Sequence, residues 1–134
     1  MNALGILARL AVVVPGDDGA AALAHSARRA RSVEVRKSAV ARLGEIVSVS
    51  GGPGHNASSA MACFRVLWDM ALSDKERAVR FSAAISVEEA VKALRGEFPE
   101  GIAALEAMAV RAEASEDRQF AVRRLASLAD GLAD

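Results

Sequence analysis

Apolar residues recur along the chain at the three- and four-residue spacing of an α-helix, and no stretch alternates as a half-buried strand does. Gly and Pro interrupt the pattern at residues 15–16, 50–54 and 96–99. The intervening segments predict seven helices, at residues 2–13, 17–30, 33–49, 56–72, 74–95, 98–113 and 116–132. Ser86 and Glu89 match a capping box, which predicts a kink or restart of helix 74–95 near Ser86.

Composition favours the same all-α interpretation. The chain has 134 residues, a common size for one domain, and 52% of them are apolar. Alanine, the best helix former, occurs 30 times, whereas Tyr and Thr are absent and aromatics make up 4%. We therefore expect residues 1–134 to form a single all-α domain.

The chain repeats itself when it is shifted by 44 residues and then by a further 38. Two sets of equivalent positions define the register: Leu23, Leu67 and Leu105, and then Arg36, Arg80 and Arg118. Each copy contains a helix, a tight turn and a second helix. The three copies span about 16–52, 54–95 and 97–134, behind the single helix 2–13.

The start of each second helix resembles the second-helix motif of HEAT repeats. Residues 32–44 contain an acidic turn followed by V-R-x-x-A-x-x-x-L; Val79-Arg80 and Ala83 repeat the motif, and the third copy has Asp117 in place of the valine. The position of Gly44 in the first copy is occupied by Glu88 in the second and by Ala126 in the third. No copy has the usual turn proline. The resemblance implies a short right-handed α-solenoid of three HEAT-like helix pairs preceded by one N-terminal helix, with the second helices on the concave side and partner binding as its function.

The repeated arginines lie within the apolar arc of the second helices. A buried guanidinium without a partner is costly, so each arginine should have one. By the resemblance, these arginines pair with turn acids and helix-end carbonyls of adjacent repeats. The candidate acids are Glu34, Asp74, Glu76, Glu116 and Asp117. Phosphate binding is the other interpretation of an arginine row, but the shared period favours a structural ladder of Arg36, Arg80 and Arg118.

Large apolar side chains fall on the arc of the second helices where solvent is expected. These are Phe81, Ile85 and Phe120, with Arg77 and Arg123 as a basic rim. Aromatic and aliphatic anchors inside a charged border are typical of a protein-binding patch. We therefore expect a protein-interaction scaffold that binds a protein or peptide here, an amphipathic helix for example. The alternative is that these side chains belong to the protein's own core.

Charge suggests a second function. The 17 basic and 17 acidic residues give a net charge of zero, which argues against a dedicated polyanion binder. Basic residues nevertheless concentrate in residues 28–42, where Glu34 is the only acid. A solvated face explains such a cluster. The alternative is a nucleic-acid-binding module in which the phosphate contacts come from Arg28, Arg29, Arg31 and Lys37.

No residue pattern predicts an enzyme, a metal or a cofactor. One cysteine and two separated histidines, His25 and His55, provide no metal-ligand spacing, and we expect Cys63 to be an inert buried thiol. Glu88 and Glu89 are neighbours on a helix and point in directions about 100° apart. The Gly-rich loop 51–56 lacks the ending of a phosphate-binding loop, although whether it binds a ligand stays open.

Helix 2–13 is apolar on most sides, with Arg9 as its only charge. One face should pack on the first repeat and the rest should find a partner, most simply a second copy in a homodimer; a helix lying across two repeats is the alternative. The stretch is too short to cross a bilayer and lacks the flanks of a signal peptide. The single cysteine and the lack of a membrane span or signal peptide together predict a cytoplasmic protein without membrane contact.

Overall fold

The computed structural model describes residues 17–50, 57–95 and 97–132, and these form six α-helices and no strand. The helices are α2 (Asp17–Arg29), α3 (Val33–Ser50), α4 (Ala57–Ser73), α5 (Arg77–Ala93), α6 (Pro99–Arg111) and α7 (Ser115–Leu132). The all-α prediction is thus confirmed over the described residues. The predicted helix 2–13, with the homodimer assigned to it, and loop 51–56 lie outside them.

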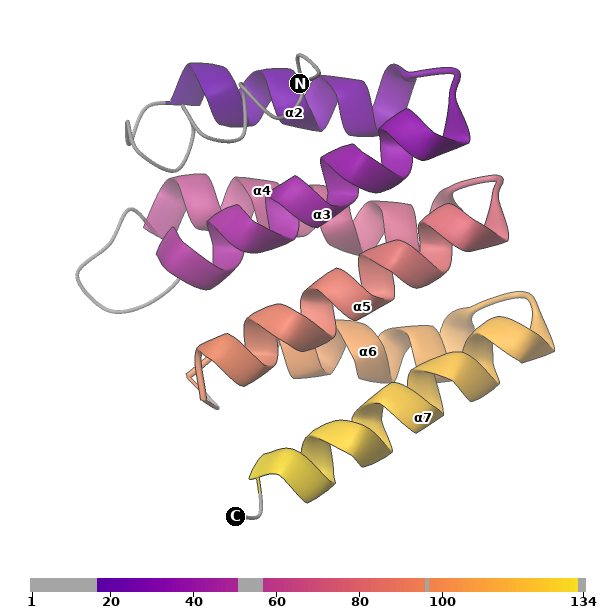
Figure 1. Cartoon of the computed structure of the whole chain (residues 1–134). Coiled ribbons are helices and arrows are strands. Elements are labelled where there is room, and N and C mark those ends of the chain that lie inside the picture. Colours follow the sequence, from indigo (N-terminus) through magenta and orange to yellow (C-terminus); the bar gives the residue numbers. More distant parts are fainter. Residues whose placement is uncertain (1–16, 51–56, 96, 133–134) are drawn as a thin grey trace.

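The six helices form three antiparallel pairs that follow one another in chain order (Figure 1). α2 packs on α3, α4 on α5, and α6 on α7. Helices α3, α5 and α7 lie side by side in one layer, nearer the viewer in Figure 1, while α2, α4 and α6 form the layer behind. Each pair corresponds to one of the three copies detected in the sequence.

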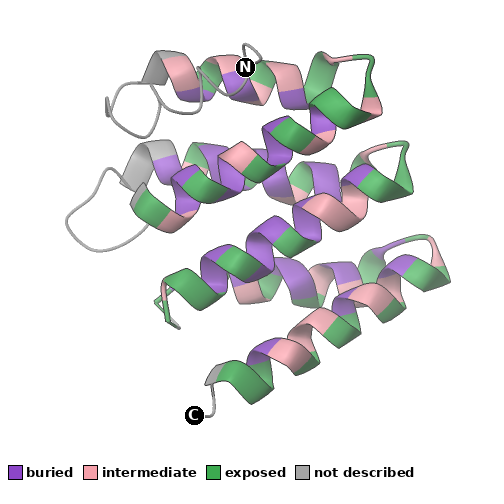
Figure 2. Cartoon of the chain, viewed as in Figure 1, coloured by how far each residue is buried: buried purple, intermediate pink, exposed green. Residues whose placement is uncertain are grey.

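The core lies between these two layers, where the buried faces of the helices meet (Figure 2). Leu23, Leu67 and Leu105, which mark the repeat register, are all buried there. On α4, Phe64 packs beside Trp68 and meets the Phe98 ring edge-on, with 4.8 Å between the Phe64 and Phe98 centroids. This contact joins the second pair to the residue that precedes α6, as expected for a helix packed between neighbours.

A glycine sets the close approach of α3 and α5. A Cβ atom at Gly44 would lie 2.8 Å from the Cβ of Ser86, so only glycine fits without displacing one of the helices. Ser86 is buried by this contact, and α5 continues unbroken from Arg77 to Ala93. The predicted restart near Ser86 is therefore wrong, whereas the alternative of a kink stays a prediction. A capping box is a local pattern, and here the serine packs within the helix against a neighbouring one.

Turn chemistry explains where α5 begins and ends. It begins at Arg77, three residues after the predicted start, because the Asp74 carboxylate accepts a hydrogen bond from the Glu76 N–H at 2.9 Å and holds a turn there. It ends at Ala93, and Arg95 then adopts the left-handed conformation, with φ of 49°, that commonly follows a helix C-terminus.

Candidate functional site

The repeated arginines connect the helix pairs. Arg36, at the start of α3, is 3% exposed. Its Nε and Nη2 donate to the Asp74 carboxylate at 3.1 and 3.3 Å, and its Nη1 donates to the Ala30 and Arg31 carbonyls at 2.8 and 3.0 Å. Arg36 therefore closes its own α2–α3 turn and holds the turn of the next pair.

Arg80 repeats this arrangement one pair further along. Its Nε and Nη2 donate to Asp117 at 2.6 and 3.4 Å, and its Nη1 donates to the Asp74 carbonyl at 2.8 Å. Arg118 donates from Nη1 to the Ala112 and Glu113 carbonyls at 2.7 and 2.9 Å. Of the five candidate acids, Asp74 and Asp117 meet the ladder, whereas Glu34 pairs with Lys37 and Glu116 with Arg77. Both edges of the Arg36 and Arg80 guanidinium groups are occupied by hydrogen-bond acceptors of the protein. Neither arginine therefore has a pair of donors available to bind a phosphate group.

A groove of about 440 Å³ runs between α3 and α5. Its lining residues are Ala41, Gly44, Glu45, Ser48, Val49, Ile85, Ser86 and Glu89. Gly44 and Ser86 are buried where the helices meet, while Val49 and Ile85 are 49% and 39% exposed. The carboxylate residues Glu45 and Glu89 are also exposed. The groove, which we call the α3–α5 groove, thus combines accessible aliphatic surface with two acidic groups.

The corresponding seam between α5 and α7 is filled by larger side chains. Phe81 and Phe120 stack with 4.0 Å between their centroids, and the Arg124 guanidinium lies 5.1 Å from the Phe120 ring. Arg124 Nη1 also donates to the buried Glu88 at 3.3 Å. At the equivalent positions, the α3–α5 seam has Lys37 for Phe81, Gly44 for Glu88, Ser82 for Phe120 and Ser86 for Arg124. Three of these four residues are smaller than their counterparts in the α5–α7 seam, which leaves room for the groove between α3 and α5.

The structure places the five predicted partner-binding residues in different surroundings. Ile85 lines the α3–α5 groove, whereas Phe81 and Phe120 are half-buried against each other in the next seam. Arg77 on α5 pairs with Glu116 at 2.6 Å, and Arg123 is exposed on α7. Of the eight groove residues, the predicted set contained only Ile85, and seven were missed, including Gly44, Ser48 and Val49. The repeat register indicated two of them, because Gly44 and Ser48 align with the larger residues Glu88 and Lys92 of the second copy.

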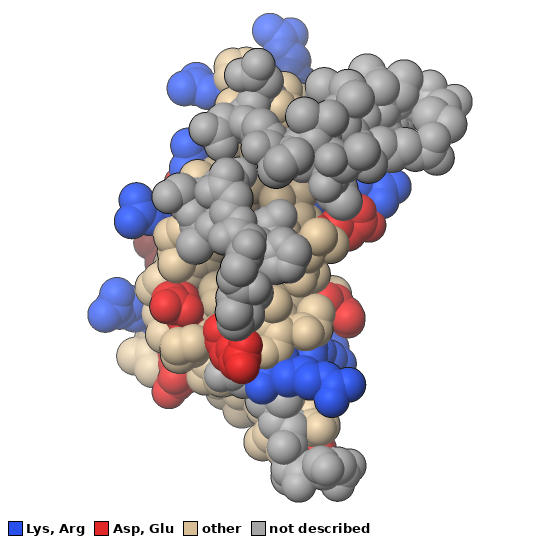
Figure 3. Space-filling model, turned by 90° about the vertical axis from the view of Figure 1, so that its left-hand side faces the viewer, with Lys and Arg blue, Asp and Glu red and all other residues tan. Residues whose placement is uncertain are grey.

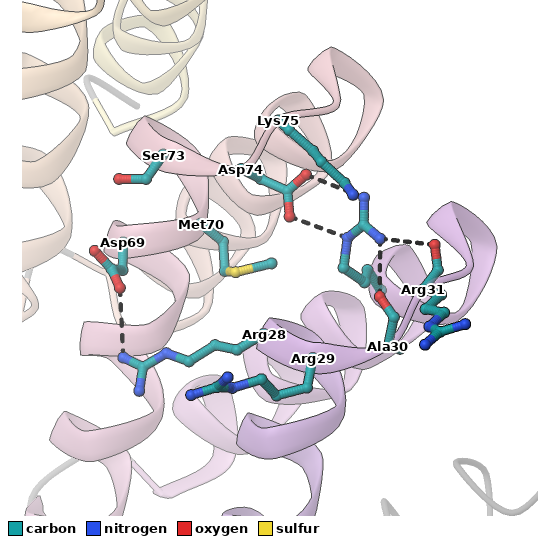
Figure 4. A pocket seen from close by; sticks show the side chains of 10 residues that line it. Arg28, Arg29, Ala30, Arg31, Asp69, Met70, Ser73, Asp74 and Lys75 are labelled. Atoms are coloured by element: carbon teal, nitrogen blue, oxygen red, sulfur yellow. Dashed lines mark hydrogen bonds and ion pairs between the residues drawn. The ribbon is translucent and has the colours of Figure 1, made fainter.

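A second pocket, of about 390 Å³, lies at the turn ends of the first two helix pairs (Figure 4). Its charged lining residues are Arg28, Arg29, Arg31, Arg36, Asp69, Asp74 and Lys75. Arg28 lies 3.5 Å from Asp69, and Arg36 is bound to Asp74. In Figure 4, Arg28 and Arg29 extend to the same side and Arg31 points away from them. We call this the basic pocket.

The basic pocket contains three of the four residues predicted to contact nucleic acid. Lys37 does not line it and lies 3.7 Å from Glu34 instead. Lys75, which sequence reasoning did not select, joins from the second helix pair. On the face drawn in Figure 3, at the other end of the helix pairs, basic and acidic side chains are interspersed. At the turn ends of the first two pairs, by contrast, the basic pocket has five basic and two acidic lining residues.

Other candidate chemistry is sparse in the part of the chain that the structure describes. No group of three or more His, Cys, Asp or Glu side chains there could hold a metal ion. None of the six helices is both long enough and apolar enough to cross a membrane. Cys63 is buried in α4. Glu88 is buried beside Arg124 whereas Glu89 lines the α3–α5 groove, so these neighbouring carboxylates face different surroundings.

The functional assignment therefore depends on this geometry, because no protein-family model, no curated protein and no solved structure matches the chain.

Proposed function

We propose that this protein is a cytoplasmic protein-interaction scaffold, built as a short α-solenoid of three HEAT-like helix pairs, which binds a partner on the concave side formed by α3, α5 and α7. The α3–α5 groove is the observation that carries this proposal. It exposes Val49 of α3 and Ile85 of α5 along one groove on the layer of second helices, where the repeat architecture presents a binding face.

The chemistry of the groove points to an amphipathic helix as its ligand. A helix packs its apolar stripe into a groove between two others, and Val49 and Ile85 provide aliphatic contacts for such a stripe. Glu45 and Glu89, one on each helix of the groove, would then face the flanks of the bound helix. Charge complementarity favours Lys or Arg at those flanks.

A pair of designed peptides tests this proposal. Two short helical peptides share a leucine stripe and differ only in carrying Lys or Glu at the flanks. We expect the Lys peptide to bind the full chain and the Glu peptide to bind at least tenfold more weakly, on the order of 1.4 kcal/mol. The reason is that like charges meet at Glu89 and at Glu45, whose ion pair with Arg42 is exposed and therefore weak. Isothermal titration calorimetry gives both affinities.

The double substitution Val49→Glu and Ile85→Glu is expected to reduce binding of the Lys peptide at least about thirtyfold, on the order of 2 kcal/mol, because it places charge against the apolar stripe. Both side chains are exposed, so the thermal midpoint should change little. Val35→Ser, an exposed valine on α3 that does not line the groove, is the matched control. Equal binding by the double variant and the control would contradict the proposed site.

The basic pocket favours a second function, the binding of nucleic acid. Arg29 and Arg31 are exposed there, and Lys75 adds a cation from the second helix pair. Such a cluster binds phosphates in a way that weakens as salt is raised. Asp69 and Asp74 offset part of the charge, which is why this function ranks second.

Salt-dependent binding separates the two functions. We consider the case in which the basic pocket binds the sugar-phosphate backbone of a nucleic acid. Changing Arg29, Arg31 and Lys75 to Ala should then reduce the slope of log binding constant against log salt concentration by up to about three, one for each lost phosphate contact. Fluorescence anisotropy with labelled duplex DNA and labelled RNA measures this slope. Arg42→Ala removes an exposed cation already paired with Glu45 at 2.7 Å and is the control. Binding that does not respond to salt or to the triple substitution would rule this function out.

A further inference from the structure

The ladder arginines use the two edges of the guanidinium group for different purposes. Nη1 of all three donates to carbonyls of the turn that precedes the arginine's own helix. The edge formed by Nε and Nη2 in Arg36 and Arg80 holds an aspartate from the following helix pair. The ladder is therefore directional, and each arginine presents a carboxylate-binding edge to the next pair.

Arg118 has the first half of this arrangement without the second. Its Nη1 reaches the Ala112 and Glu113 carbonyls as its counterparts reach theirs, which holds the guanidinium in the ladder position. Among the described residues, no carboxylate meets its Nε or Nη2. The two occupied copies show what this edge binds, namely an aspartate carboxylate gripped by two roughly parallel hydrogen bonds.

Two valines of the third helix pair, one on α6 and one on α7, are exposed. The residues four positions after the ladder arginines are Val40, Ala84 and Val122. Val40 and Ala84 are fully buried, whereas Val122 is 54% exposed. On α6, Val110 stands at the position of the half-buried Leu72 and is 77% exposed. From the repeat register we infer that Val110, Arg118 and Val122 lie on one surface, which we call the α6–α7 end face.

We propose that the α6–α7 end face binds a helical segment of another protein that carries an aspartate or glutamate near its N-terminal end, with the carboxylate held by Nε and Nη2 of Arg118. The bound segment places apolar side chains on Val110 and Val122, as a further helix pair of the stack would. A second copy of this chain stacked in register does not fit. The positions of Asp74 and Asp117 are occupied in its first repeat by Ala30 and Val35, which bring no carboxylate to Arg118.

A tethered probe of known sequence tests this site. A duplicate of residues 97–132 is fused after residue 134 of the full chain through a short Gly-Ser linker, which raises its effective concentration. The duplicate's Asp117 is then the carboxylate. The readout is the exchange rate of the Arg118 Nε–H in ¹⁵N-edited NMR spectra, with the signal identified by its loss in Arg118→Lys. We expect the fused duplicate to slow this exchange at least about tenfold, as a charge-assisted hydrogen bond does.

Two matched variants make the result specific. Asp117→Asn, placed in the duplicate only, should restore fast exchange at Arg118 while leaving the original Arg80–Asp117 pair intact. Val122→Ser should also weaken docking, with little effect on the unfused chain, because Val122 is exposed. Docking that is insensitive to the Asn variant, or no docking at all, would overturn the proposal. So would concentration-dependent protection of Arg118 in the unfused chain, because the occupant would then be a second copy. None of these outcomes depends on the α3–α5 groove.

Discussion

Changing Arg36 to Ala should lower the free energy of unfolding by about 3–5 kcal/mol, because it leaves a buried carboxylate without its cation. The Arg36 side chain is 3% exposed and that of Asp74 is 6% exposed. The substitution also removes the donor for the Ala30 and Arg31 carbonyls at the end of α2. Urea denaturation of the full chain, followed by circular dichroism, measures the loss.

Two further substitutions distinguish the effect of losing the buried Arg36–Asp74 ion pair from the effect of losing a positive charge at any position. Arg42→Ala removes an arginine whose ion pair with Glu45 is about half exposed, and its cost should stay below about 1 kcal/mol. Arg36→Lys keeps the positive charge but loses the planar fork, so its cost should lie between those of the two alanine variants. If Arg36→Ala proves no more destabilising than Arg42→Ala, the ladder does not hold the helix pairs together.

Changing Phe64 to Ala should also cost about 3–5 kcal/mol, through loss of buried apolar surface and the cavity that remains. Phe64 is 2% exposed and packs on Trp68 and Phe98, so its removal loosens the contact between the second and third helix pairs. Trp68 is the only tryptophan in the chain and lies 5.8 Å from Phe64, ring centroid to ring centroid. Its fluorescence therefore reports unfolding at the site of the change.

Val110→Ala provides the comparison for Phe64→Ala. Val110 is 77% exposed, so shortening it should change the free energy of unfolding by less than about 0.5 kcal/mol. A loss of 1 kcal/mol or less in Phe64→Ala would mean that Phe64 is not in the core contact described here. The two variants together thus test the placement of the core between the two helix layers.

The amino-acid sequence by itself determined the six helices of the described residues and the need for the ladder. Helix formation depends on apolar residues spaced along one face and on Gly and Pro between segments, and both are local properties that can be read directly. The cost of burying an unpaired guanidinium is likewise independent of the fold, so an arginine within an apolar arc implies a partner. Which of the candidate acids pairs with Arg36 could not be read from the local sequence. Asp74 and Glu76 are two residues apart in one turn, and only the Asp74 carboxylate reaches the guanidinium.

Only the tertiary structure decided which predicted surface residues are accessible and where the groove lies. A helical wheel places Phe81 on its own helix, but it does not show that Phe120 of the next pair covers it. The same limit explains Ser86, whose local pattern indicated a helix start although its position in the fold packs it against Gly44. The α3–α5 groove depends on how closely two helices approach, and that distance is set by Gly44 and Ser86 together, which lie far apart in the sequence. Contacts between repeats therefore decided where the accessible groove lies, because they depend on side-chain volumes from two helices at once.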